Sequence, residues 1–182
     1  YCRNNSGGVP DNFHNYFVAE FDKDFAITHT WNDNWELQKN NLNSKGKHVG
    51  AIIGFKTKRG EKVRVKVASS FISLEQAQLN LHREIGDDSF ETTKIKAKNA
   101  WEKEFRRIEI ESDNKEHIKT FYSCLYRVLL FPRTFYEFDK NHKRMHYSPY
   151  NGKVLPDYMF TDNGFWDTFR AVFPFFNMMY PE

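Results

Sequence analysis

Apolar and polar positions alternate with a period of two along the N-terminal part of the chain, as expected of strands with one covered face. The predicted strands are residues 15–21, 25–30, 49–57 and 62–69. The last of these alternates most regularly, so Val63, Val65 and Val67 are predicted to face inward. A short polar segment with a glycine separates the last two strands, which predicts a hairpin. The polar residues 32–47 are expected to form a loop or a wide hairpin.

The apolar spacing changes to three and four after residue 72, which predicts amphipathic helices. Three start signals, each a capping type of side chain ahead of an apolar run, lie at residues 73–76, 88–91 and 113–116. The third helix is expected to stop by Pro132, and a last helical piece to be interrupted at Pro174, because proline disrupts a helix interior. Strands followed by helices indicate an α+β chain in which two architectures are joined in sequence.

Residues 133–160 show no clear period and are rich in Tyr, His and Asp, so we expect a long irregular segment with an Asn-Gly turn. His142 and His146 have the spacing of a metal pair on a helix, but Pro149 and the polar surroundings argue against a helix there, and zinc is disfavoured. The candidate acid–base carboxylates in or beside this segment are Glu137, Asp139, Asp157, Asp162 and Asp167. Sequence spacing does not show which of them converge on one bond.

The sequence G-F-W-D-T-F-R at residues 164–170 has the composition of a sugar-binding motif. The indole of Trp166 can cover the apolar face of a pyranose ring, and the carboxylate of Asp167 can accept from two of its hydroxyls. On a helix Arg170 would lie within reach of Asp167, and Phe165 is a further wall candidate. The alternative is structural: Trp and Phe as core anchors, an Asp–Arg surface pair, and Asp162 or Asn163 as a helix cap.

Composition and charge narrow the range of functions. The chain has 182 residues, of which 40% are apolar and 17% aromatic, enough to build a sizeable core. With 28% charged residues and a net charge of +3, we expect no nucleic-acid partner. No apolar run reaches about 18 residues, so no membrane span is expected. Neither a phosphate-binding loop nor the motifs G-x-G-x-x-G, G-x-S-x-G and H-E-x-x-H occur. Cys2 and Cys124 need not pair, and Cys124 is predicted to be a small core residue.

Several segments, in chain order, together resemble one enzyme family. They are the strand at residues 17–25, V-R-V-K-V-A-S-S-F-I-S-L-E-Q-A-Q-L-N-L at 63–81, F-R-R-I-E-I at 105–110, F-Y-S-C-L-Y-R-V-L-L at 121–130 and G-F-W-D-T-F-R-A-V-F-P at 164–174. The chain is thereby similar to glycoside hydrolase family 92, calcium-dependent exo-acting α-mannosidases with an N-terminal β-sandwich and an (α/α)6 barrel.

The resemblance implies an α+β multidomain fragment, in which antiparallel β-sandwich strands precede the helices of an incomplete (α/α)6 barrel. We expect residues 1–72 to be the C-terminal part of the sandwich, residues 73–112 to be linker helices, and residues 113–182 to be the first helices and loop of the catalytic domain. The chain begins without a methionine or a signal-type run, so we expect a processed chain or an excised piece. Its apolar helix faces predict self-association or marginal stability.

The resemblance also implies roles for the motif. In the family the tryptophan and aspartate line the pocket for a terminal mannose, so Trp166 and Asp167 are expected to contact sugar, Arg170 to support Asp167, and Phe165 to be a weaker contact. The family's general acid, general base and calcium ligands lie downstream, so none is assigned here and the piece alone is expected to be inactive. The complete enzyme would remove α-mannose from mannans or N-glycans by inverting, calcium-dependent hydrolysis, outside the cell, in the periplasm or at the surface. The alternative is a non-catalytic carbohydrate-binding or interaction module.

Overall fold

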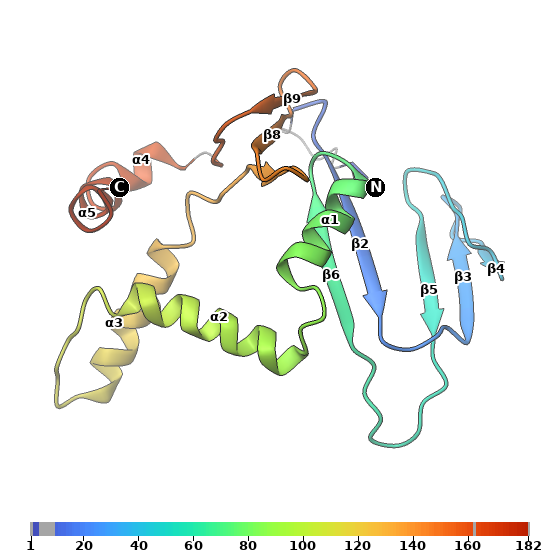
Figure 1. The fold of residues 1–182 in the computed structure, drawn as a ribbon, viewed down its shortest axis with the longest axis horizontal. Helices are drawn as coiled ribbons and strands as arrows, with labels where there is room; N and C mark the ends of the chain where they lie inside the picture. Colours follow the sequence, from blue (N-terminus) through green and yellow to red (C-terminus); the bar gives the residue numbers. More distant parts are fainter. Residues whose placement is uncertain (1, 4–9, 162, 182) are drawn as a thin grey trace. The chain divides into compact units, whose positions relative to one another are not determined.

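The computed structural model describes residues 2–3, 10–161 and 163–181. The chain forms two compact units, residues 18–67 on the one hand and residues 1–17 with 68–182 on the other. The order of strands and helices along the chain can be followed in Figure 1. We describe each unit by itself.

Three short strands form an antiparallel sheet within residues 18–67. The strands are β3 (Ile27–Trp31), β4 (Leu37–Lys39) and β5 (Gly50–Gly54), and β3 lies in the middle. Thr30 on β3 is opposite Gln38 on one side and Ala51 on the other, and it is 5% exposed. Its hydroxyl donates to the side-chain carbonyl of Gln38 at 3.0 Å. The polar segment after β3 is therefore a wide hairpin, which is one of the two forms predicted for residues 32–47.

A second sheet has the order β1-β2-β6, with β1 at Cys2–Arg3, β2 at His14–Phe21 and β6 at Val65–Ser70. The predicted hairpin between residues 49–57 and 62–69 is wrong, because β5 pairs with β3 whereas β6 pairs with β2. The predicted inward face is also wrong, since Val65 and Val67 are 49% and 54% exposed. A period of two fixes which side chains share a face, but it does not show whether anything covers that face.

All three predicted helix starts are confirmed. The helices are α1 (Leu74–Glu84), α2 (Phe90–Phe105) and α3 (Lys115–Val128). Their caps are Ser73, Ser89 and Asn114, each of which accepts a hydrogen bond from a backbone N–H of the first turn at 3.0 to 3.1 Å. Such a cap satisfies one of the N–H groups that the helix leaves without a partner. Cys124 is exposed on α3, where Leu125 is the buried residue, so its predicted place in the core is wrong.

The segment predicted to be irregular contains a three-stranded antiparallel sheet. Its strands are β7 (Glu137–Phe138), β8 (Arg144–Ser148) and β9 (Lys153–Pro156). They have two to five residues each, which is too short for a period to stand out in the sequence. The Asn-Gly turn joins β8 to β9, with Gly152 at a φ of 70°. Tyr147 on β8 is buried and its hydroxyl donates to the carbonyl of Asn12 at 2.9 Å.

The C-terminal helical piece is α4 (Phe165–Thr168) followed by α5 (Val172–Met179). The break lies at residues 169–171, not at the predicted Pro174, which is the third residue of α5. Proline is tolerated in a first turn, because its missing N–H would have no partner there. No helix in the described part of the chain is long and apolar enough to cross a bilayer.

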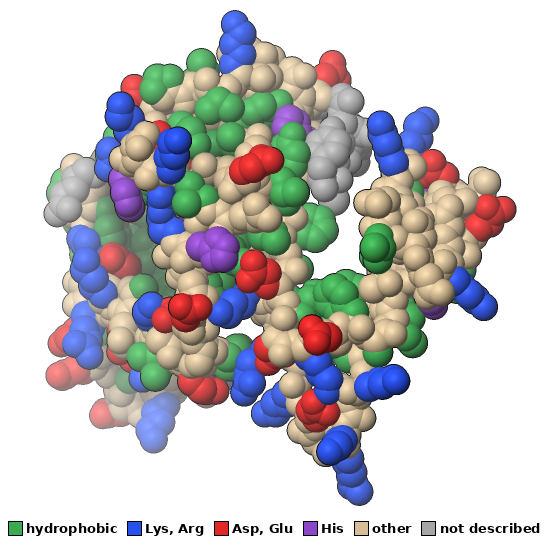
Figure 2. All heavy atoms as spheres, turned by 45° about the vertical axis from the view of Figure 1, so that its right-hand side comes forward, with side chains coloured by type: hydrophobic (Ala, Val, Ile, Leu, Met, Phe, Trp, Pro, Cys, Tyr) green, Lys and Arg blue, Asp and Glu red, His purple; other side chains and the backbone are tan. Residues whose placement is uncertain are grey.

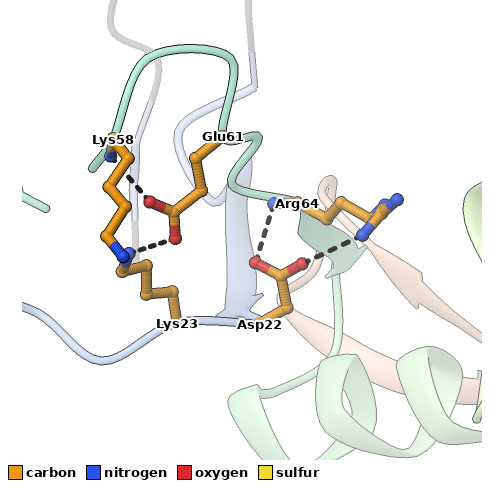
Figure 3. Close-up of polar contacts among 5 residues, drawn as sticks. All are labelled: Asp22, Lys23, Lys58, Glu61 and Arg64. Carbon is orange, nitrogen blue, oxygen red and sulfur yellow. Dashed lines mark hydrogen bonds and ion pairs between the residues drawn. The ribbon is translucent and has the colours of Figure 1, made fainter. Parts of the chain in front are cut away.

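Charged side chains fix the turn that precedes β6, as Figure 3 shows. Glu61 accepts hydrogen bonds from the ammonium group of Lys23 and from the N–H of Lys58, the latter at 2.8 Å. Next to it, the carboxylate of Asp22 accepts from the N–H of Arg64 at 2.8 Å and lies 3.6 Å from its guanidinium. The bond from Lys23 is the largest of the effects that lower the pKa of the Glu61 carboxyl.

We expect Lys23→Met to raise the pKa of Glu61 toward its ordinary value of about 4.3, because the main cause of the lowering is removed. Because the pKa of Glu61 is lower in the folded state than in the unfolded state, its carboxylate stabilises the fold when the pH is above the unfolded-state pKa. That stabilisation is lost as the pH falls through the folded-state pKa. Carboxyl NMR titration measures the shift, with Lys140→Met as the control. An unchanged Glu61 pKa in Lys23→Met would contradict this account of the turn.

Candidate functional site

The motif at residues 164–170 forms the short helix α4 and the turn after it. Gly164 precedes the helix with ψ at 88°, and no side chain caps it. Asn163 is therefore not a cap, and Asp162 lies outside the described residues. The helix is held by its own bonds: the N–H and the hydroxyl of Thr168 both donate to the carbonyl of Gly164, at 3.1 and 2.9 Å.

Phe169 is the ring around which the motif packs. Phe165 is stacked on it with 5.4 Å between ring centroids, and Trp166 lies at 6.1 Å. The guanidinium of Arg170 lies 5.0 Å from the centre of the same ring, a cation–π distance. The structure thus brings Phe165, Trp166 and Arg170 together around Phe169, a residue that sequence reasoning did not select.

Trp166 and Phe165 both lie at the surface of the described chain. Trp166 is 81% exposed, and Phe165 is 67% exposed although it also contacts Phe173. An indole of this kind presents a broad apolar face to solvent, the surface to which sugar rings bind. The alternative in which Trp166 anchors a helical core is wrong for the chain as described.

The partner predicted for Arg170 cannot be assigned from the structure. The backbone of Asp167 is in α4, but its side chain, like Asp162, lies outside what the structure describes. The pairing of Asp167 with Arg170 therefore stays a prediction.

Two of the other candidate carboxylates accept hydrogen bonds from described residues. Asp139 accepts hydrogen bonds from the N–H groups of Asn141 and Lys143, both at 2.8 Å, and the bond from Lys143 is the main cause of its lowered pKa. Glu137 accepts from Ser70, Phe71 and Asn80. Asp157 has a φ of 75° beyond the end of β9. No described contact links any two of these three carboxylates.

A ladder of hydrogen bonds holds the segment that leads into α4. The N–H of Phe135 donates to the carbonyl of Met159 at 2.8 Å, and the N–H of Thr161 donates to the carbonyl of Arg133 at 2.9 Å. The N–H of Arg133 donates in turn to the hydroxyl of Thr161 at 2.8 Å. Residues 159–161 are therefore fixed against residues 133–135 just before the motif begins. Isolated pairing of this kind leaves no signal in the sequence.

The last helix is fastened to the end of α2 by Arg107. Its guanidinium donates to the carbonyl of Met179 at 3.1 Å and to the carboxylate of Glu104 at 3.0 Å. It also lies 4.5 Å from the centre of the Tyr180 ring. Burial, followed by the nearby charge of Glu104, raises the pKa of Tyr180.

An open cavity of about 340 Å³ lies between α2 and α3, lined by Ala100, Trp101, Glu104 and Leu129. Its lining is mostly apolar, with Trp101 packed 4.6 Å from Tyr126. As for metals, no three His, Cys, Asp or Glu side chains cluster closely enough to hold an ion in the described part of the chain.

Comparisons with known proteins agree with the resemblance in the sequence. The description "Glycosyl hydrolase family 92 catalytic domain" matches residues 76–182, and "Glycosyl hydrolase family 92 N-terminal domain" matches residues 1–70. The chain belongs to glycosyl hydrolase family 92. A comparison with curated proteins found no match.

Solved structures of the family resemble the chain over most of its length. An inverting mannosidase of this family from Bacteroides thetaiotaomicron is 47% identical, with a TM-score of 0.90, over 96% of this chain and 24% of that one. An α-mannosidase from the same bacterium, in complex with mannoimidazole, is 27% identical with a TM-score of 0.73, over 91% of this chain and 22% of that one. A further family 92 hydrolase, 23% identical with a TM-score of 0.77, shows the shared fold. The chain thus spans about a quarter of the length of these enzymes.

We expect Arg107→Ala to loosen α5, because it removes the bond to Met179 and the contact with Tyr180. The guanidinium is partly exposed, so the loss is about 1 kcal/mol of local stability. Hydrogen exchange of residues 172–179 measures it. Arg106→Ala at the neighbouring position is the control, and equal exchange in the two variants would mean that Arg107 does not hold the helix.

Proposed function

We propose that this chain is part of a glycosidase that removes terminal α-linked mannose, and that Trp166, Asp167, Arg170 and Phe165 form one wall of its mannose subsite. The observation that carries the proposal is the exposed indole of Trp166 on α4, in a chain that belongs to family 92. The similar structures with printed activities are mannosidases, which favours mannose-containing glycans, in mannans or N-glycans, as the substrate.

Each residue has a physical task in this subsite. The indole of Trp166 covers the C–H face of the sugar and excludes water from it. The carboxylate of Asp167 accepts hydrogen bonds from two adjacent hydroxyls, which fixes the orientation of the ring. Arg170, whose guanidinium rests on Phe169, donates to the sugar or to Asp167. Phe165 contributes apolar wall.

The proton transfers are not assigned to this chain. An inverting glycosidase needs an acid on the leaving oxygen and a base on the attacking water, about 6.5–9.5 Å apart, and the candidates Glu137 and Asp139 already serve as local hydrogen-bond acceptors. We propose, as the family resemblance implies, that the acid and the base come from residues downstream of Glu182. The isolated chain is accordingly proposed to be inactive.

The proposal also covers the cofactor of the complete enzyme, the place where the enzyme acts and the association of the isolated chain. Calcium is proposed as the cofactor of the complete enzyme, with ligands from outside this chain, because the family that the chain resembles is calcium-dependent. The enzyme is proposed to act outside the cell, in the periplasm or at the surface, where glycans are met. The isolated chain is proposed to self-associate, because many large apolar side chains lie at its surface, as the green patches of Figure 2 illustrate.

The second candidate is a carbohydrate-binding or interaction module without catalysis. The same observation supports it, because an exposed tryptophan beside an arginine binds a sugar whether or not a bond is broken. Activity of the complete gene product separates the two candidates.

We expect Trp166→Ala to lower kcat/KM for an aryl α-mannoside in the complete gene product by about 30-fold, the equivalent of about 2 kcal/mol of lost apolar contact. The matched control is Trp35→Ala, because Trp35 is 74% exposed and lies in the other unit. The proposal predicts nearly unchanged activity for that control. Equal activity of the two variants would place the sugar elsewhere.

Asp167→Ala should abolish most mannoside hydrolysis with the fold intact, because the sugar hydroxyls lose a charged acceptor. A calcium chelator should inactivate the unmodified protein, and added calcium should restore it. Steady-state kinetics with circular dichroism as the folding control gives the answer. Full activity of the variant would make the motif structural, and an unmodified protein that binds mannose without hydrolysing mannosides would favour the binding module.

A further inference from the structure

We propose that Glu137 is a positioning residue for the motif at residues 164–170, through hydrogen bonds that fix the segment leading into α4. The inference rests on the proposed function, because it concerns how the mannose wall is held in place. It assigns Glu137 no contact with the substrate.

The carboxylate of Glu137 accepts three hydrogen bonds. One oxygen accepts from the hydroxyl of Ser70 at 3.0 Å and from the N–H of Phe71 at 2.9 Å. The other accepts from the side-chain amide of Asn80 at 2.7 Å. Ser70 is 1% exposed and ends the match to the N-terminal domain, whereas Asn80 lies in the match to the catalytic domain. One side chain on β7 thus joins the regions that match the two domains.

Helix α1 adds further bonds to the same strand. The side-chain amide of Gln76 donates to the carbonyl of Phe138 at 2.8 Å. The guanidinium of Arg83 donates to the carbonyls of Phe138 and Asp139, both at 2.9 Å. Gln76 itself is 6% exposed. β7 is therefore fixed to α1 by several bonds besides that of the carboxylate, and Glu137 sets its register against Ser70 and Phe71.

The residues just before Glu137 connect β7 with the segment that leads into the motif at residues 164–170. Phe135 stacks on Phe71 with 4.3 Å between centroids, and its N–H donates to Met159 at 2.8 Å. Arg133 and Thr161 exchange two further bonds, at 2.9 and 2.8 Å. α4 begins shortly after Thr161. A shift of the chain at Glu137 would therefore move the start of α4, and with it the exposed indole.

The charge state of residue 137 matters because its partners are all donors. A glutamine of the same size has one acceptor oxygen, and its amide group would face the amide of Asn80 donor to donor. Glu137→Gln should therefore break the contact with Asn80 while it keeps those with Ser70 and Phe71. Adding Asn80→Asp supplies an acceptor for the new amide and restores the contact with residue 137, although it removes the bond that the Asn80 amide donates to the carbonyl of Ser69.

The experiment uses the complete gene product and four forms: unmodified, Glu137→Gln, Glu137→Gln with Asn80→Asp, and Glu61→Gln as a matched control. Glu61 is also a glutamate that holds a turn, but in the other unit (Figure 3). We expect Glu137→Gln to raise hydrogen exchange at residues 133–137 and 159–168 and to lower kcat/KM about 10- to 100-fold. The double variant should recover most of the protection from exchange and most of kcat/KM. Glu61→Gln should change neither the exchange of these residues nor kcat/KM.

Unchanged exchange at residues 159–168 in a folded Glu137→Gln variant would overturn the inference and leave the proposed function untouched. A loss that the double variant does not recover would also overturn it, because general destabilisation would then explain the effect. If Glu137→Gln fails to fold, Asn80→Ala removes one of the three donors to Glu137, together with the bonds of Asn80 to Ser69 and Gln76, and is judged by the same exchange. Altered exchange in a protein without mannosidase activity would support the positioning role and overturn the proposed function.

Discussion

The carboxylate of Glu137 accepts hydrogen bonds from the end of β6, from the residue after it and from α1. These donors lie 57 to 67 positions before Glu137 in the sequence. Their convergence fixes β7, and β7 in turn fixes residues 133–135 and 159–161 just ahead of α4. We infer that these polar contacts position the proposed mannose wall from a distance.

The apolar core of this chain, which spans about a quarter of the length of its relatives, is small. Among the described residues the buried apolar side chains are Ala77, Leu81, Leu125 and Tyr147. Helix caps, the bonds of Glu137 and Arg107, and stacked rings such as Phe71 on Phe135 hold the local structure instead. Large apolar side chains at the surface, Trp166 among them, then remain available to bind something else, and membership of the family supports a sugar as the partner of Trp166.

The helices could be predicted because their signals are local. Ser73, Ser89 and Asn114 each cap a helix through bonds to residues two or three positions on. Strand pairing is not local: the periodic pattern of residues 62–69 predicts a strand correctly but does not show that β6 pairs with β2 across a long loop. The role of Glu137 could not be predicted for the same reason: its hydrogen-bond donors are distant in sequence, so in the sequence it looks like any carboxylate of a loop. Of the site, the motif could be chosen from residue types, while Phe169 and the supporting segment could not.

The central claim is that the face of Trp166 binds the terminal mannose. A crystal structure of the complete gene product with mannoimidazole, the ligand of the α-mannosidase similar to this chain, tests it most directly. The account predicts the sugar-like ring stacked on the indole of Trp166, with the carboxylate of Asp167 bound to two of its hydroxyls. A ligand bound away from α4, or an indole covered by other parts of the protein, would contradict it.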